Sequence, residues 1–316
     1  MIARLQRWLL TGQVLIGVIV AVWLAASDRL PVWAAVAVGL LAPFTVQIAL
    51  LTIEFTVAWA ARGARPGEVP RGGFVASLWA WLVAWARELV DSTRTFSFAQ
   101  PLLAGRPFAL GAVSTEKLPV LLVHGYFCNR ALWRPMAARI AEARHAVDAI
   151  DLEPPFASID DYAPRIAAAV DALRARTGAA RIGLVGHSMG GLAIRSYLRS
   201  HGDAAVACVV TLGTPHQGTL NAQFGHGRNV RQMRRNSPWL QALAASESPQ
   251  RLALFTVVIS WQDNIVVPQA VQTLPGSRTV MLHGLGHVSL AYHPSVSRIV
   301  LEALTAAEGG RARPSA

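Results

Sequence analysis

Two long apolar segments open the chain. Residues 8–26 carry no charged side chain, and residues 32–53 are equally free of charge. Because a helix needs about 20 residues to cross a bilayer, the pattern predicts two spans, at about 8–26 and 32–53, that form a membrane hairpin within residues 1–73. Pro43 predicts a kink in the second span, and Glu54 is expected at the membrane interface.

A third apolar segment, residues 74–91, is shorter. Arg87 and Glu88 interrupt it and leave about a dozen apolar residues, too few to cross a bilayer, so we expect an amphipathic helix in the membrane interface. The alternative is a third span, which would move the rest of the chain to the other side of the membrane. For the first segment the alternative is a signal peptide, but its apolar run is longer than a typical signal core.

From residue 92 the pattern changes to short strand-like runs that alternate with helix-like segments. Such alternation predicts a mostly parallel sheet with helices on both faces. We therefore expect one α/β domain over residues 92–308 and a disordered tail at 309–316. The expected strands are 119–124, 145–152, 181–187, 205–213, 252–260 and 278–283, and the expected helices are 131–143, 159–177, 190–200 and 294–306.

Composition is more apolar than that of an average soluble protein. Of the 316 residues, 53% are hydrophobic and only 15% are charged. The net charge of +11 comes almost wholly from arginine, because Lys117 is the only lysine. These arginines are scattered rather than arrayed with aromatic side chains, so we do not predict nucleic-acid binding. Acidic lipid headgroups and an arginine-rich proteome are the two explanations that remain for the charge.

The arginines also predict how the hairpin is oriented. The connection between the two spans holds only Arg29, whereas more arginines flank the hairpin on either side, namely Arg4, Arg7, Arg62, Arg65 and Arg71. Arginine-rich flanks stay in the cytoplasm. Both ends of the hairpin, and the domain that follows it, are therefore expected on the cytoplasmic side.

The two cysteines are too few for a disulfide framework or a cluster of metal ligands. Cys208 lies in a strand-like run, where cysteine commonly acts as a small hydrophobe, and Cys128 has no paired base in the sequence. We expect both to be free structural thiols. The sequence predicts neither a metal site nor a cofactor site.

The most informative stretch is 181–195, RIGLVGHSMGGLAIR, in which a short apolar run meets a glycine-rich turn and then becomes helical in pattern. A G-x-S-x-G sequence between a strand and a helix forms a nucleophile elbow, which presents the serine hydroxyl above the sheet. Ser188 is therefore the predicted nucleophile. Gly186 and Gly190 are needed because a side chain at either position would collide with the neighbouring strand or helix.

A serine nucleophile needs a base, and the base needs an orienting carboxylate. Asp263 follows one strand-like run, and His287 follows the next, within GLGHVSL. In open sheets such strand ends form sites, and histidine titrates near neutrality. We therefore predict Asp263 as the acid and His287 as the base, in the chain order Ser188, Asp263, His287. A simple turn role for Asp263, and His283 or His293 as the base, are the alternatives.

Two backbone amides are expected to hold the negative charge of the tetrahedral intermediate. One belongs to Met189, directly after the nucleophile. The other is assigned to Tyr126 in the loop after the first strand, LPVLLVHGYFCN, with Phe127 as the alternative. His124 in the same stretch is expected to make structural hydrogen bonds rather than to act as a base.

Five motifs occur in order along the chain: VHGYF, LVGHSMGGLAIRSYL, TLGTPHQGT, SWQDNIVVP and GLGHVSL. Together they resemble the lipase and esterase family of α/β-hydrolases, especially bacterial triacylglycerol-lipase-like enzymes, over residues 118–305. The resemblance implies the α/β-hydrolase fold and ester hydrolysis without metal or organic cofactor. It also implies the triad Ser188, Asp263 and His287, with oxyanion amides from Tyr126 and Met189. Unlike secreted members of the group, this chain opens with a predicted membrane hairpin.

The sequence thus predicts a membrane-anchored serine hydrolase, in the inner membrane of a bacterium, whose substrate is a lipid or another hydrophobic carboxylic ester. Acyl transfer through the same acyl-enzyme is one alternative. A membrane scaffold without catalysis is the other, although a scaffold would not need the whole triad. The sequence does not predict an oligomeric state.

The sequence of residues 220–243 is compatible with two structures. Four arginines lie here among apolar side chains, namely Arg228, Arg231, Arg234 and Arg235. The segment is either a basic amphipathic cap that meets lipid or an ordinary helix that packs beside the site with its arginines in solvent.

Overall fold

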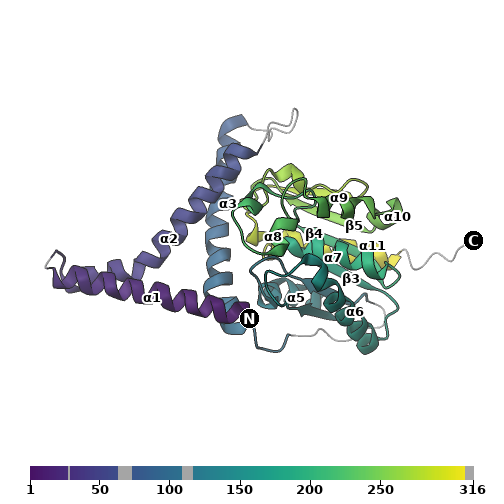
Figure 1. Cartoon of the computed structure of the whole chain (residues 1–316), viewed down its shortest axis with the longest axis horizontal. Coiled ribbons are helices and arrows are strands. Elements are labelled where there is room, and N and C mark those ends of the chain that lie inside the picture. Colours follow the sequence, from purple (N-terminus) through teal and green to yellow (C-terminus); the bar gives the residue numbers. More distant parts are fainter. Residues whose placement is uncertain (28, 63–72, 109–116, 310–316) are drawn as a thin grey trace, which may run out of the picture.

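The computed structural model describes residues 1–27, 29–62, 73–108 and 117–309, and it shows a six-stranded sheet preceded by long helices (Figure 1). All paired strands are parallel, in the order β2-β1-β3-β4-β5-β6. The strands are β1 (Val120–Val123), β2 (Val147–Ile150), β3 (Ile182–His187), β4 (Val206–Leu212), β5 (Phe255–Ser260) and β6 (Arg278–Leu282).

Helices fill the connections and the N-terminal part. The α-helices are α1 (Ile2–Ala26), α2 (Val32–Ala61), α3 (Gly73–Thr93), α4 (Gln100–Leu103), α5 (Arg134–Glu142), α6 (Ala163–Thr177), α7 (Met189–His201), α8 (Arg228–Gln232), α9 (Pro238–Ala245), α10 (Pro249–Leu252) and α11 (Pro294–Gly309). A π-helix, η1 (Arg94–Ala99), follows α3. Single 3-10 turns are η2 (Arg130–Trp133), η3 (Ile159–Tyr162), η4 (Leu220–Gln223), η5 (Gln269–Gln272) and η6 (Val288–Ala291).

The sheet confirms the predicted α/β architecture, and each predicted strand and helix lies where the apolar pattern placed it. The central strands read as continuous apolar runs because helices cover both of their faces; every residue of β3 and of β5 is buried. On the edge strand β6, Arg278 and Thr279 are exposed. Burial on both faces thus explains why these segments show no alternation of polar and apolar residues.

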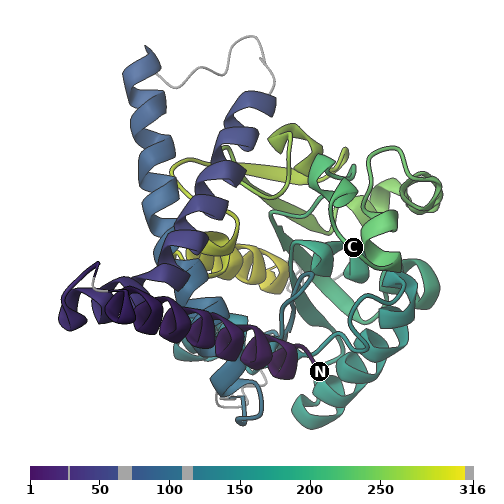
Figure 2. The same cartoon turned by 60° about the vertical axis from the view of Figure 1, so that its left-hand side comes forward.

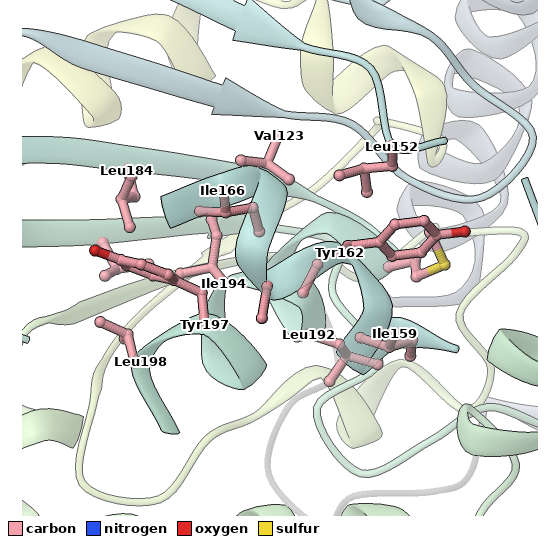
Figure 3. Close-up of a cluster of buried hydrophobic side chains, with 14 of the residues drawn as sticks. Val123, Leu152, Ile159, Tyr162, Ile166, Leu184, Leu192, Ile194, Tyr197 and Leu198 are labelled. Atoms are coloured by element: carbon pink, nitrogen blue, oxygen red, sulfur yellow. The ribbon is translucent and has the colours of Figure 1, made fainter. Parts of the chain in front are cut away.

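Two hydrophobic cores sandwich the sheet, one on each face. Side chains of β1 alternate between them, with Leu121 and Val123 in one core and Val120 and Leu122 in the other. The first core is completed by α6 and α7, whose side chains meet those of the sheet in Figure 3. The second is completed by α5 and α11. This packing fixes the sheet and leaves the carboxyl ends of its strands to form a site.

The first two helices are long and apolar enough to cross a membrane, judged by length and composition. They cross closely near Gly17 and Gly39, where a Cβ on Gly17 would lie 2.4 Å from the carbonyl oxygen of Gly39. Small residues allow helix backbones this approach. From the crossing the helices diverge toward the α/β domain (Figures 1 and 2), and the Met1 amino group forms an ion pair with Glu153.

Helix α3 joins the hairpin to the α/β domain. Phe55 of α2 meets Trp81 of α3 edge to face, with ring centroids 5.9 Å apart, and Val267 of the α/β domain packs in the same cluster. The second predicted span continues past residue 53 to Ala61, with Pro43 inside the helix. Residues 63–72 of the predicted linker and 310–316 of the predicted tail lie outside the described residues.

Candidate active site

Ser188 stands in a sharp turn between β3 and α7. Its φ of 56° and ψ of −129° place it in a region that residues other than glycine rarely adopt. Its backbone N–H donates to the carbonyl oxygen of Leu212 on β4 at 2.8 Å, which holds the turn against the sheet. Strained backbone of this kind persists where the surrounding structure enforces it, as at an elbow that exposes a side chain.

The two elbow glycines are required by close approach, as predicted. A Cβ on Gly186 would lie 2.7 Å from the backbone nitrogen of Gly191 in α7. A Cβ on Gly190 would lie 2.2 Å from the carbonyl oxygen of Val123 in β1. Either contact would force backbone apart, so a larger residue would displace the turn that carries Ser188.

Asp263 and His287, from loops after β5 and β6, meet in the structure. The Nδ1 atom of His287 donates to Oδ2 of Asp263 at 2.8 Å, and both side chains are buried. The other carboxylate oxygen of Asp263 accepts the backbone N–H groups of Ile265 and Val266, each at 2.8 Å. The carboxylate is therefore fixed before it orients the imidazole.

The backbone of His287 is held on both sides. Its N–H donates to Oδ1 of Asn264 at 3.0 Å, and its carbonyl oxygen accepts Nε2–H of His187 at 2.9 Å. Burial would lower the pKa of His287, but the carboxylates of Asp263, Glu88 and Glu54 together more than offset this effect, so that the pKa is raised above 6.5. Burial lowers the pKa of His187 to about 3, which keeps that imidazole neutral.

A cavity of about 550 Å³ opens at this point, and Ser188 and His287 both line it. Most of its wall comes from the N-terminal helices rather than from the sheet domain. The apolar lining side chains include Leu9 and Leu10 of α1, Val46, Leu50 and Leu51 of α2, and Phe96 of η1. The nucleophile therefore faces a largely apolar space that the hairpin encloses.

The predicted oxyanion donors flank the nucleophile. Met189 is the first residue of α7, and Tyr126 follows Gly125, where a Cβ would lie only 2.7 Å from Cβ of Ser188. The Tyr126 hydroxyl donates to the carbonyl oxygen of His226, and Tyr126 lines the cavity together with Ser188. Phe127, the alternative donor, has a positive φ of 56° and also lines the cavity. The donor roles of both amides stay predictions.

The other histidines considered for the site, His283, His293 and His124, make different contacts from those of His287. His283 is exposed just after β6, and His293 shares a hydrogen bond of 2.7 Å with Ser295 at the start of α11. His124 is buried, with Nδ1 2.9 Å from the carbonyl oxygen of Gly125 and Nε2 accepting the N–H of Leu152. Among the histidines that the structure describes, only His287 forms a hydrogen bond with the Asp263 carboxylate.

The sequence alone assigned no site role to three residues that lie near Asp263 and His287. Glu54 of α2 and Glu88 of α3 both line the cavity, and Asn264 links Glu54 to His287. Burial raises the pKa of Glu88 to about 7. A carboxylate within an apolar helix is costly and is typically functional, and that signal was present in the sequence.

The structure contains no group of three or more potential metal ligands within its described ranges. Cys128 lines the cavity, but burial raises the pKa of its thiol to about 12, so it stays protonated and unreactive near neutral pH. Cys208 is also a free, buried thiol, and burial raises its pKa to about 12.

Residues 220–243 form the short elements η4, α8 and α9 rather than one long amphipathic helix. Several of their apolar side chains, among them Val230, Met233 and Leu240, are buried in the core that contains α6 and α7, whereas Phe224 is 80% exposed. The four arginines are exposed, and no residue of this segment is among those that line the cavity. Part of the segment thus packs against the core, and contact of its arginines with lipid stays a prediction.

Comparison with known proteins finds a family match over part of the sheet domain. The family described as alpha/beta hydrolase fold matches residues 119–256, which include Ser188 but neither Asp263 nor His287. The chain is 32% identical over 153 residues to a triacylglycerol lipase of Burkholderia plantarii, covering 45% of this chain and 41% of that protein. It is 35% identical over 120 residues to a triacylglycerol lipase of Pseudarthrobacter phenanthrenivorans, covering 35% and 37% respectively. The chain thus spans about two fifths of the length of these relatives.

Solved structures agree on the fold. The lipase BlEst2 of Bacillus licheniformis, in its mature form, superposes with a TM-score of 0.54 at 19% identity, covering 63% of this chain and 96% of that one. Lipase B of Aspergillus fumigatus superposes with a TM-score of 0.53 at 17% identity, covering 63% and 55%. At this identity the likeness shows the shared fold alone.

Proposed function

We propose that this chain, an α/β-hydrolase similar to bacterial triacylglycerol lipases, is a membrane-anchored serine hydrolase that cleaves hydrophobic carboxylic esters. The hydrogen bond between Asp263 and His287, at the cavity that Ser188 also lines, carries this proposal. A nucleophile, a buried carboxylate and a histidine in this chain order are the parts that acyl transfer to serine requires.

In the first half-reaction, Nε2 of His287 takes the proton of Ser188 as Oγ attacks the ester carbonyl carbon. Asp263 orients the ring through Nδ1–H and stabilises the imidazolium that forms. The amides of Tyr126 and Met189 hold the oxyanion, helped by the N-terminus of α7. The tetrahedral intermediate collapses as His287 gives its proton to the departing alcohol oxygen, and the acyl group stays on Ser188.

In the second half-reaction, His287 takes a proton from water as the water oxygen attacks the acyl-enzyme carbonyl. The C–O bond to Ser188 breaks, and His287 returns the proton to Oγ. The products are a carboxylic acid and the regenerated enzyme. No metal or organic cofactor takes part in this scheme.

The apolar cavity wall supports the proposal that the substrate is an ester with a hydrophobic acyl group. The side chains of Leu9, Leu50 and Phe96 offer apolar contact, and burial of each methylene contributes about 0.8 kcal/mol. Because this wall belongs to the helices that are apolar enough to cross a membrane, an ester that arrives from the bilayer reaches Ser188 without crossing water. We place the enzyme in the bacterial inner membrane with its sheet domain in the cytoplasm; a reporter fused after residue 316 tests that side.

The decisive experiment is Ser188→Ala in the full chain, purified in detergent. We expect loss of ester hydrolysis and of labelling by a fluorophosphonate probe, since both need the serine oxygen. Ser200→Ala, at the end of α7, is the matched control and should keep both activities. Labelling that survives in Ser188→Ala would overturn the assignment. Transesterified product on addition of an alcohol would instead identify an acyltransferase.

A further inference from the structure

A buried carboxylate from the N-terminal helices reaches the loop that carries His287. Glu88 of α3 is 1% exposed, and its two oxygens accept the backbone N–H groups of Val288 at 2.8 Å and Ser289 at 2.9 Å. These amides begin η6, the 3-10 turn directly after His287. Glu88 thus supplies acceptors for free N–H groups at the start of a turn, from a segment 200 residues away in the chain.

The neighbouring residue holds the other side of the same loop. Arg87 donates from Nη1 to the carbonyl oxygen of Gly284 at 2.9 Å. Between the two anchor points the loop lies directly on Glu88, because a Cβ on Gly286 would lie 2.4 Å from the Glu88 carboxylate. Arg87 and Glu88, which interrupt an otherwise apolar helix, therefore form hydrogen bonds to the loop before and after His287.

A second carboxylate, that of Glu54, is linked to the backbone of His287 through the side chain of Asn264. Oε2 of Glu54 on α2 accepts Nδ2–H of Asn264 at 2.9 Å, and Oδ1 of Asn264 accepts the backbone N–H of His287 at 3.0 Å. The amide of Asn264 is thereby fixed with its oxygen toward His287. Two of the N-terminal helices thus contact the loops that follow β5 and β6.

We infer that Glu88 is a positioning residue for the proposed catalytic histidine, so that helix α3 is part of the active site and not only of the membrane anchor. The inference rests on the proposed role of His287. The hydrogen bonds to Asp263, Asn264 and His187 engage Nδ1, N–H and C=O of His287, which leaves Nε2 for Ser188. Glu88 fixes the following two residues, and so the direction in which Nε2 points.

The carboxylate also contributes charge. Its negative form raises the pKa of His287, along with Asp263 and Glu54, whereas the nearby His187 imidazole stays neutral. Arg87, next to Glu88 in the chain, directs its guanidinium to Gly284. Burial raises the pKa of Glu88 itself to about 7, so this charge acts only where Glu88 is ionised. Its removal moves the ionisation of His287 to lower pH, which a purely structural helix contact would not do.

The test compares Glu88→Gln with Glu302→Gln, which removes an exposed carboxylate on α11, in the full chain. A glutamine at 88 keeps the shape but offers one acceptor for two amides and carries no charge. We expect kcat to fall about 10- to 100-fold with little change in KM, because the histidine is misplaced rather than the substrate. The acid limb of the profile of kcat/KM against pH should move to lower pH. Glu302→Gln should match the wild type in both.

Glu88→Asp separates position from charge and serves if the glutamine variant does not fold. Its shorter carboxylate cannot reach both amides, so kcat should fall while the acid limb stays near that of the wild type. Wild-type kcat and an unmoved acid limb in the Glu88 variants would overturn the inference, even where Ser188→Ala is inactive. An active, labelled Ser188→Ala would instead overturn the proposed function itself.

Discussion

The sheet domain and the N-terminal helices differ in which side chains they bury. In the sheet domain, apolar side chains are buried and the candidate catalytic groups lie after strand ends, as with Asp263 and His287. On α1 and α2, large apolar side chains face outward; Trp8 is 70% exposed and Leu40 is 69% exposed. The carboxylate of Glu88 on α3 is instead buried. Helices that expose apolar side chains and bury a carboxylate are typical of proteins whose outer surface lies in an apolar environment and whose buried charge has polar partners.

The contrast shows that the site is shared between the two regions. The proposed catalytic groups come from strand ends of the α/β-hydrolase fold, whereas most of the cavity wall comes from helices that precede the family match at residue 119. We therefore expect mutations in the two regions to separate the proposed chemistry from substrate choice.

The largest effect is expected in the sheet domain, from Asp263→Asn. The amide keeps the shape but favours the wrong tautomer of His287, so kcat should fall by about 10⁴-fold. Steady-state hydrolysis of a p-nitrophenyl ester measures it, with Asp171→Asn on the exposed face of α6 as the charge-matched control. A loss of less than tenfold would remove Asp263 from the triad.

The next effect is expected in the helices, from Leu50→Trp, which fills part of the cavity. We expect kcat/KM to fall roughly 10-fold for a long-chain ester relative to the acetate, since each lost methylene contact costs about 1–3 kcal/mol. Leu40→Trp is the control, because Leu40 is exposed on the same helix and does not line the cavity. Equal effects of the two variants on chain-length preference would mean that α2 is only an anchor.

A smaller effect concerns pH. Burial would lower the pKa of His287, but the carboxylates of Asp263, Glu88 and Glu54 together raise it above 6.5. Since His287 must be neutral to act as a base, kcat/KM should decline as pH falls through that raised pKa, about tenfold per pH unit at the lower end. A profile from pH 5 to 9 with an uncharged ester tests this, and an acid limb below 6.5 would contradict it.

The smallest effect is expected from Arg231→Gln in α8. Arg231 is exposed and remote from the cavity lining, so hydrolysis of vesicle-bound and soluble esters should change less than twofold, and stability by less than about 0.5 kcal/mol. Activity assays with anionic and neutral vesicles measure it. A selective loss on anionic vesicles would restore the basic-cap alternative.

Much of this arrangement was predictable because it is local in the chain. The elbow sequence and the strand-like runs before Asp263 and His287 predicted which residues lie at strand ends, and parallel strands bring those ends to one edge. Residues 220–243 remained ambiguous, because exposed arginines beside buried Val230 fit both a cap and a packed segment. The structure shows that Val230 packs against the core, and contact of the exposed arginines with lipid stays a prediction.

By itself, the sequence determined the parallel sheet, the elbow at Ser188 and two helices apolar enough to cross a membrane, because each follows from periodicity or a short motif. Only the tertiary structure decided that Glu88 holds the loop of His287 and that α1 and α2 enclose the cavity. In the sequence Glu88 only interrupts an apolar run. Its hydrogen-bond partners lie 200 residues away, and no local pattern encodes which amides a buried carboxylate will meet.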